Sequence, residues 1–391
     1  MQEIIKQRSQ EILDEVITIR RHIHKYPELS FQEFETSAFV QSKLKEWGVD
    51  FQTGFVQTGI VATIQGGKSN GETVGLRADM DALPIVEQNS VDYKSSNEGV
   101  MHACGHDVHT AMLLGATKVL KELQAELPVN VKCIFQPGEE KLPGGAKLMI
   151  EEGILEEPKV SKMFALHVFP ELDAGEIGLK SGMYMASCDE IHITVKGKGG
   201  HAAMPAKYIN PLVGASKLIL ELQELVAAAK PENVPSVLAF GRIEGLGATN
   251  VIPEEVKIQG TFRTMNEEWR SKAHQILRDE SPKIVGSIGA TVNIDVQVGY
   301  PYLENHPELT EQSRAILKTQ LGSENVHDLP TRMTGEDFAY FSQAVPSTFI
   351  RIGVRNKDKG IIHPVHHPKF DIEESAMSTG IETFCSLVLN S

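Results

Sequence analysis

The sequence predicts an α/β protein with a mixed sheet, into which a second α+β module of the ferredoxin-like type is inserted. Short apolar strands alternate with amphipathic helices up to about residue 167, which is typical of a parallel or mixed sheet. Strict apolar–polar alternation begins near residue 190, and the first pattern returns after residue 300. We therefore expect a discontinuous domain over 1–184 and 300–391, and an inserted domain over 185–299. A chain of 391 residues is long enough for two cores.

The first domain is expected to begin with two helices. Apolar residues at helical spacing predict one helix over 2–24, and Arg20 and His24 near its end are expected to be solvated or to cap it. Ser30, followed by Glu33, is the expected N-cap of a second helix that ends at Gly48. The elements expected next are strands at 59–64, 74–78, 129–135 and 163–167, and helices at 107–126 and 144–153.

The inserted module reads as strand, helix, strand, strand, helix, strand, which is the ferredoxin-like order. Its elements are expected at 190–196, 210–229, 236–244, 255–264, 266–286 and 290–298. The chain then returns to the first domain with helices at 307–321 and 373–388 and a strand at 347–353.

Composition excludes several classes of partner and location. A net charge of −14 without a basic stretch argues against nucleic acid and anionic membranes, and no apolar segment approaches the roughly 20 residues of a membrane span. The N-terminus lacks the pattern of a secretory signal, and the four cysteines are scattered. We expect a cytoplasmic protein in a reducing compartment.

The segment 101–110 carries three histidines, a cysteine and an aspartate. Cys104 and His106, two residues apart, can point at one metal ion from a tight turn, although a buried cysteine and helix-capping histidines are the more common explanation of an isolated pair. More polar residues follow the expected strands, where open α/β sheets gather ligands. These residues are Asp79, Asp81, Glu139, Glu140 and His167.

Together with His366, these residues are sufficient for a di-metal hydrolase. Such a site needs a bridging ligand, further ligands for each ion, and a base that reaches the attacking water. The ligand candidates are Cys104, His106, Glu140, His167 and His366. Glu139 is then free to act as the general base. Taken singly, the glutamate pair fits a solvated loop, and His167 fits a core histidine.

These residues lie in motifs that resemble the aminoacylase and carboxypeptidase family of di-metal peptidases. The chain looks most like its amidohydrolase branch, which includes N-acyl-amino-acid amidohydrolases and hippurate hydrolases. The resemblance covers essentially the whole chain. The matching stretches are Arg20–Glu28, Leu76–Pro84, Met101–Asp107, Gly199–Pro205, Asn250–Pro253, Gly335–Phe338 and His366–Phe370.

The resemblance implies a role for each site residue. Cys104 matches the bridging ligand of two divalent ions, for which zinc or manganese is favoured and nickel or cobalt is also compatible. His106, Glu140, His167 and His366 match the other ligands, with His367 as an alternative to His366, and Glu139 matches the base. Asp81 and Asp107 are expected to orient imidazoles. Asp79 and His109 are left undecided.

The inserted domain of the family is a lid that also forms a dimer interface. The resemblance therefore implies a homodimer or a higher homo-oligomer, in which His201 points towards the site of the partner subunit. Asn250 and Arg263 resemble residues that hold a substrate carboxylate. A turn role for Asn250 and a solvent-facing strand position for Arg263 remain open.

The expected activity is metal-dependent hydrolysis of N-acyl amino acids. A dipeptidase or carboxypeptidase on the same scaffold and an N-acetyldiaminopimelate deacetylase are alternatives, and a non-catalytic metal-binding scaffold is an alternative of another class. Family members usually carry alanine where this chain has Gly138, and their glycine-rich turn follows more closely than Gly144–Gly145 does here. The substrate preference of a characterised branch is therefore not simply inherited.

Overall fold

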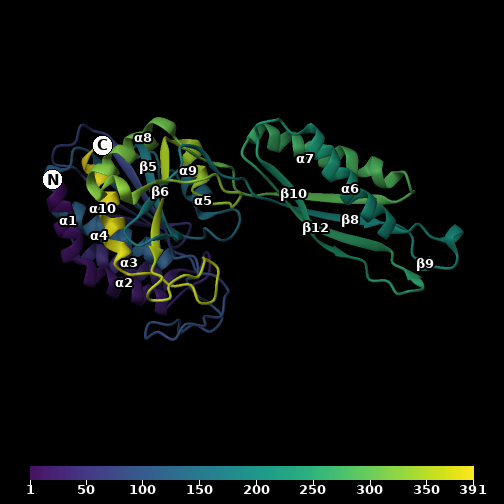
Figure 1. Cartoon of the computed structure of the whole chain (residues 1–391), viewed down its shortest axis with the longest axis horizontal. Helices are drawn as coiled ribbons and strands as arrows, with labels where there is room; N and C mark the ends of the chain where they lie inside the picture. The colour runs from purple at the N-terminus through teal and green to yellow at the C-terminus, as the bar shows by residue number, and fades with distance from the viewer. The chain divides into compact units, whose positions relative to one another are not determined.

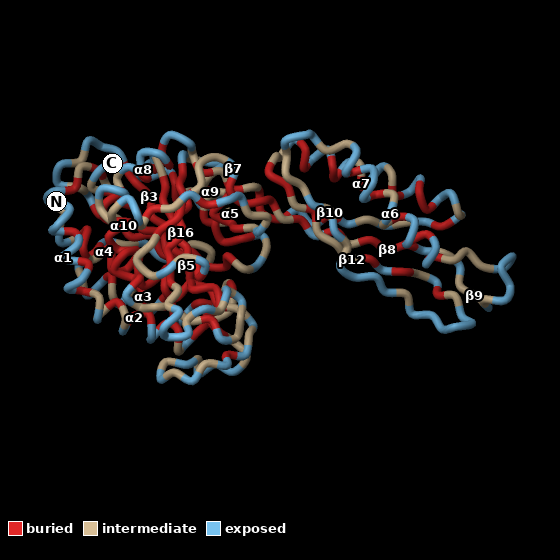
Figure 2. Tube along the Cα trace, in the orientation of Figure 1, coloured by how far each residue is buried: buried red, intermediate tan, exposed pale blue.

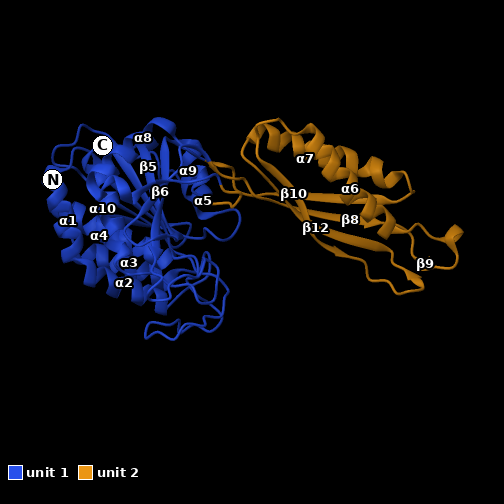
Figure 3. Ribbon diagram, viewed as in Figure 1, with its two compact units in different colours: residues 1–183, 304–331, 337–391 blue, residues 184–303, 332–336 orange.

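The computed structural model describes all 391 residues and divides into two compact units (Figure 3). The first unit comprises residues 1–183, 304–331 and 337–391, and the second comprises 184–303 and 332–336. A mixed eight-stranded sheet in the first unit and a separate antiparallel sheet in the second confirm the predicted fold class. No helix in the chain is both long and apolar enough to cross a membrane.

The sheet of the first unit has the strand order β1-β2-β4-β3-β5-β16-β6-β15 (Figure 1). Strands β4, β3 and β5 are parallel neighbours, whereas β1 and β2 pair in the antiparallel sense at one edge. The strands are β1 (Asp50–Phe55), β2 (Gly59–Ile64), β3 (Thr73–Asp79), β4 (Asn130–Gln136), β5 (Val160–Asp173), β6 (Ile177–Leu179), β15 (Val326–Asp328) and β16 (Ser347–Arg355). The strands β7 (Gly182–Met185) and β14 (Leu303–Asn305) pair in a separate two-stranded ribbon.

One helix, α4 (His106–Glu122), is buried along most of its length, as Figure 2 shows. It packs against β3 and β5 and against the helices α1, α2, α3 and α10. A helix surrounded in this way is buried on nearly every side, so the polar groups of its first turn are buried beside the sheet as well. The other helices are α1 (Gln2–Glu11), α2 (Leu13–Lys25), α3 (Phe34–Glu46), α5 (Gly145–Glu151), α8 (Pro307–Leu321), α9 (Ala339–Ala344) and α10 (Ala376–Leu389).

Several local expectations were wrong. The single helix over 2–24 is two helices that meet at Ile12. Ser30 is not a helix cap: α3 begins at Phe34, and the carboxylate of Glu28 accepts hydrogen bonds from the first N–H groups of that helix instead. The strands β1, β6, β7, β14 and β15 were not predicted, because they are short or lie partly exposed at an edge and lack a continuous apolar run.

The second unit has the ferredoxin-like arrangement. Its sheet order is β10-β12-β8-β13, all antiparallel, and two helices pack together and against the sheet. These elements are β8 (Asp189–Lys196), α6 (Pro211–Ala229), β10 (Ser236–Glu244), β12 (Glu255–Thr264), α7 (Glu267–Gly286) and β13 (Thr291–Val298). A short ribbon of β9 (Gly200–His201) and β11 (Val251–Ile252) extends from this core.

Candidate metal centre

The polar residues of the first unit gather at the carboxyl ends of three parallel strands. Asp79 is the last residue of β3 and is paired with Gln136, the last residue of β4. His167 lies in β5, two residues beyond Ala165, which pairs with β3. Because the three strands run side by side in one direction, the loops that follow them meet at one edge of the sheet.

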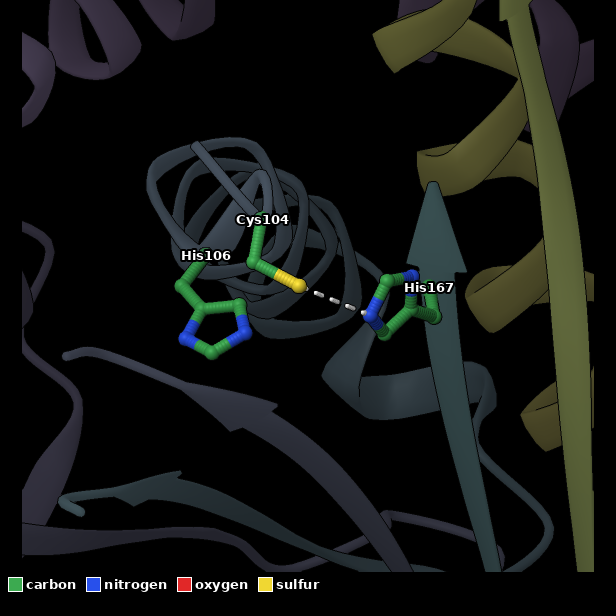
Figure 4. Close-up of side chains that lie close together, drawn as sticks. All are labelled: Cys104, His106 and His167. Atoms are coloured by element: carbon green, nitrogen blue, oxygen red, sulfur yellow. Dashed lines mark hydrogen bonds between the residues drawn. The ribbon is translucent and has the colours of Figure 1, made fainter. Parts of the chain in front are cut away.

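The five ligand candidates form overlapping groups at this edge. Cys104, His106 and His167 have ligand atoms within 4.8 Å of one another, and so do Cys104, Glu140 and His366. Figure 4 shows the sulfur of Cys104 between the imidazoles of His106 and His167, with 3.5 Å from Sγ to Nε2 of His167. Cys104 is therefore the member that joins the two groups, as a bridging ligand must be.

His366, rather than His367, faces this cluster. Nε2 of His366 lies 3.2 Å from Oε1 of Glu140, and its backbone N–H donates to Ala103 O, which ties it to the Cys104 loop. His367 instead stacks its ring on His363, with 4.3 Å between the ring centroids.

The hydrogen bonds around the imidazoles leave nitrogen lone pairs free for a metal. Asp81 contacts His106 through Nδ1 at 3.1 Å, and Nε2 of His106 is buried without any hydrogen-bond partner. Nδ1 of His167 donates to the carbonyl of Val168 at 2.8 Å, so its Nε2 carries no proton in the neutral ring. A buried, unpartnered imidazole nitrogen beside a thiol is unfavourable unless a cation completes it, so these residues fit a metal ion.

The charges in the cluster point to the same conclusion. Hydrogen bonds to Cys104 and Glu140 raise the pKa of His366 to about 10. Burial opposes protonation of His106, but the nearby charges of Asp79 and Cys104 raise its pKa well above the usual value. Both imidazoles thus attract positive charge, which a divalent cation would supply while the rings stay neutral.

Glu139 lies beside this cluster and is held by the backbone of the unit. Its carboxylate is buried, and its Oε1 accepts a hydrogen bond from the N–H of Asp337 at 3.4 Å. One of its oxygens also lies within 4.8 Å of ligand atoms of His106 and Glu140. The adjacent backbone N–H of Glu140 donates to Asp81 at 2.9 Å, so one aspartate contacts both the glutamate loop and His106.

Gly138 has a structural partner that the sequence did not reveal. A Cβ at this position would lie 2.4 Å from the ring of Phe31, which itself has a positive φ of 65°. The carboxylate of Glu33 accepts hydrogen bonds from the N–H groups of Phe31 and Gly138, each at 2.9 Å, and also from the hydroxyl of Thr58. Glycine at position 138 therefore leaves room for an aromatic ring beside the Glu139 loop.

Arg77 is a second residue that the sequence reasoning did not place. Its guanidinium is buried in β3 and donates to Gln136 at 2.8 Å, to Asp79 at 2.6 Å and to Asp337 at 2.7 Å. It thereby links the ends of β3 and β4 to the segment that contacts Glu139. The available signal was an arginine and an aspartate inside an otherwise apolar strand, because a charged residue is buried only when it is paired.

Arg20 and His24 are buried rather than solvated, so that expectation was wrong. Arg20 Nε and His24 Nδ1 both lie 2.7 Å from Oδ2 of Asp107, and His24 Nε2 lies 3.3 Å from Glu87. Asp107 thus holds the imidazole of His24, which is not one of the ligand candidates, whereas Asp81 contacts the candidate ligand His106. These contacts anchor the first turn of α4 to α2.

Three predicted site residues lie in the second unit. Val251 pairs with His201 between β11 and β9, and Ala202 N donates to Asn250 O at 3.0 Å, so His201 and Asn250 share one ribbon. Nδ1 of His201 accepts from the N–H of Ala203 at 3.1 Å. Arg263 lies separately on β12 and donates to the carbonyl of Met333 at 3.1 Å.

Comparison with known protein families identifies the family of this chain. The family model described as "Peptidase family M20/M25/M40" matches residues 75–390, which include every candidate ligand. The chain belongs to this peptidase family. The resemblance to the di-metal peptidases is therefore confirmed, and the M20 chain is a metal-dependent hydrolase that acts on carbon–nitrogen bonds.

The relatives of this M20 chain are named for different activities. It is 40% identical over 364 residues to N-acetyl-L-cysteine deacetylase of Bacillus subtilis, covering 93% of this chain and 85% of that protein. It is 37% identical over 381 residues to thermostable carboxypeptidase 1 of Saccharolobus solfataricus, covering 97% and 95%. The solved structure of the YXEP protein of Bacillus subtilis, described as a dinuclear metal binding peptidase, matches with a TM-score of 0.82 at 32% identity, covering 97% and 98%.

Proposed function

We propose that this M20 enzyme hydrolyses the amide bond of N-acyl amino acids, using two divalent metal ions held by the five clustered ligand candidates. The observation that carries the proposal is a buried carboxylate, Glu139, beside a cluster joined by Cys104. The similarity to a deacetylase over 93% of the chain supports the acyl-amino-acid substrate class. Zinc and manganese both suit the mixed thiolate, imidazole and carboxylate ligands, and nickel and cobalt are also compatible.

The protein residues divide the remaining work. Two bound cations would lower the pKa of a water molecule and polarise the amide carbonyl. Glu139 takes the proton of the attacking water and returns it to the nitrogen of the leaving amino acid, a transfer that suits a carboxylate held by the Asp337 N–H. Asp81 keeps His106 oriented, because it contacts Nδ1 of that ring and leaves Nε2 towards the cluster.

The second unit is proposed to act as a lid and as a dimer contact, with His201 serving the site of the partner subunit. Because Nδ1 of His201 accepts a backbone hydrogen bond, a neutral ring carries its proton on Nε2. That N–H can donate to the oxyanion that forms on the amide carbonyl. Asn250 on the same ribbon and Arg263 on β12 are proposed to bind the substrate carboxylate, for which a guanidinium is well suited.

The role of Glu139 is tested by the variant Glu139→Gln. We expect it to keep both metal ions and to lose turnover by at least about 100-fold, the lower range for a general base. Glu140→Gln is the matched control, since it should lose metal and activity together. Metal content per chain and the rate with N-acetyl amino acids are measured on both. A Glu139→Gln enzyme with ordinary turnover would remove Glu139 from the role of base.

A carboxypeptidase activity is the second candidate, because the similarity to a carboxypeptidase extends over 97% of the chain. N-acetyl and N-benzoyl amino acids, N-acetyldiaminopimelate and dipeptides, compared by kcat/KM on metal-analysed enzyme, separate these activities. A preference for dipeptides over every N-acyl amino acid would overturn the proposed substrate class and leave the metal site untouched.

A further inference from the structure

Both ring nitrogens of His109 are already occupied by protein groups. Its Nε2 accepts a hydrogen bond from the backbone N–H of Val168 at 2.9 Å, and its Nδ1 lies 2.6 Å from Oδ1 of Asp79. A backbone N–H can only donate, so Nε2 carries no proton. The proton of the neutral ring must therefore sit on Nδ1, where it is donated to Asp79.

Val168 is the residue that fixes the neighbouring candidate ligand. Its carbonyl accepts the Nδ1–H of His167 at 2.8 Å, which leaves Nε2 of His167 facing Sγ of Cys104 at 3.5 Å. The last pair between β3 and β5 is Arg77 with Ala165, so β5 continues past its neighbour at this point. There the imidazole of His109, from α4, binds the backbone of β5.

Asp79, the partner of His109 Nδ1, is itself held by two further hydrogen bonds. Its Oδ2 accepts from Arg77 at 2.6 Å, and its carbonyl accepts from the hydroxyl of Thr110 at 2.7 Å. His109 is 1% exposed, and its ring centroid lies 4.5 Å from that of His167. A continuous chain of contacts thus runs from Arg77 through Asp79, His109 and Val168 to His167.

The position of His109 also allows a different reading. Asp79, His106 and His109 have ligand atoms within 4.8 Å of one another, which is close enough for a shared cation. A ligand histidine, however, needs a free lone pair directed at the metal. His109 has none, because one nitrogen carries the proton given to Asp79 and the other accepts from Val168.

We propose that His109 is a positioning residue that, by binding the backbone of Val168, fixes the tautomer and position of His167 without binding metal itself. This inference rests on the proposed role of His167 as a ligand. The residues that orient metal-binding imidazoles typically change metal affinity by about 10- to 100-fold when they are removed. Loss of the His109 contact should therefore weaken one of the two metal sites by that amount.

The test measures zinc binding by competition with a chromophoric chelator in the whole protein. His109→Leu should bind one zinc ion about 10- to 100-fold more weakly than the unchanged protein. His109→Gln should recover most of that loss, because its amide oxygen can accept the Val168 N–H. The matched control is His102→Leu, which replaces a buried histidine of the same segment whose ring nitrogens have no hydrogen-bond partner. It should bind zinc as the unchanged protein does.

The tautomers are read independently of activity by nitrogen NMR of histidine-labelled protein. Without metal, His109 and His167 should both carry the proton on Nδ1. Added zinc should change the chemical shift of the Nε2 resonance of His167, and the resonances of His109 should show no zinc coordination. Zinc coordination at His109, or unchanged zinc affinity in folded His109→Leu, would overturn the proposal. If His109→Leu does not fold, the tautomers of His109 and His167 in the unchanged protein decide whether His109 positions His167 or binds zinc itself.

Failure of the underlying function gives a different result. If His167→Ala binds two zinc ions with the affinity of the unchanged protein, then His167 is not a ligand and the proposed metal site itself is wrong. If His167→Ala loses a zinc ion and His109→Leu does not, only the positioning role fails.

Discussion

Gly105 lies between two candidate ligands at a position where an added methyl group has no room. Its φ is +84°, and a Cβ there would lie 2.6 Å from one methyl group of Val168. In Gly105→Ala the left-handed backbone costs about 1–2 kcal/mol. The forced contact adds about 1–3 kcal/mol, the usual cost of overpacking. We therefore expect Gly105→Ala to lower the free energy of unfolding of the first unit by roughly 2–5 kcal/mol.

Gly153 provides a matched control for the backbone cost. It has the same φ of +84°, in the same unit, and a Cβ there would meet nothing within 4 Å. Gly153→Ala should therefore cost only about 1–2 kcal/mol. The difference between the two variants isolates the contact with Val168.

The measurement is urea unfolding of metal-free protein in a Trp269→Phe background. The chain has two tryptophans, and the remaining one, Trp47, lies in the first unit and reports on it. Adding Val168→Ala to Gly105→Ala should recover part of the loss, with a coupling of about 1–3 kcal/mol in the double-mutant cycle. Equal losses for Gly105→Ala and Gly153→Ala, or strictly additive effects of Gly105→Ala and Val168→Ala, would refute the reasoning.

Three more predictions concern the groups around the cluster. Gly138 has a φ of +61°, so Gly138→Ala should destabilise the protein by about 2–5 kcal/mol, through the left-handed backbone and the displacement of Phe31. Phe31→Ala should relieve part of this loss in urea unfolding, and an undiminished loss would contradict the contact. Burial and the charge of Asp81 raise the pKa of Glu33 from 4.5 to about 7, so folded metal-free protein keeps a proton that the unfolded chain releases. Its stability should fall as pH rises between those values, and Glu33→Gln should flatten that slope; an unchanged slope excludes Glu33 as the cause. Arg77→Met leaves two buried aspartates without their guanidinium partner and should cost about 3–5 kcal/mol in urea unfolding, whereas a loss under 1 kcal/mol would rule out that pairing energy.

Much of the fold and the type of chemistry could be predicted from local sequence. Buried parallel strands need long apolar runs, so β3, β4 and the start of β5 were predicted near their observed positions, whereas the partly exposed edge strand β1 was missed. Thiol, imidazole and carboxylate groups that follow such strands must meet at one edge of the sheet, whatever the details of their contacts. This rule accounts for His167 and Glu140, each of which shares a group of close ligand atoms with Cys104.

The partners of the buried charged groups depended on tertiary structure. Ser30 had the sequence context of a helix cap, yet its hydroxyl donates to Asp81 at 2.7 Å, because a buried carboxylate needs donors more than an exposed helix end does. Arg20 reaches Asp107 across 87 residues of chain, and no periodicity reports a contact of that kind.

The sequence by itself determined which side chains could bind metal and at which edge of the sheet they would meet, because residue type and strand direction are local properties. Only the tertiary structure decided that Asp81 and the Val168 carbonyl occupy Nδ1 of His106 and of His167, so that Nε2 is the nitrogen left for a metal. It also decided that His109, with the same side chain three residues beyond His106, has both nitrogens occupied by protein groups. The physical reason is that the tautomer of a buried imidazole is set by the donor or acceptor facing its other nitrogen, and for these three rings that group comes from a strand packed beside α4 or from the loop that follows it.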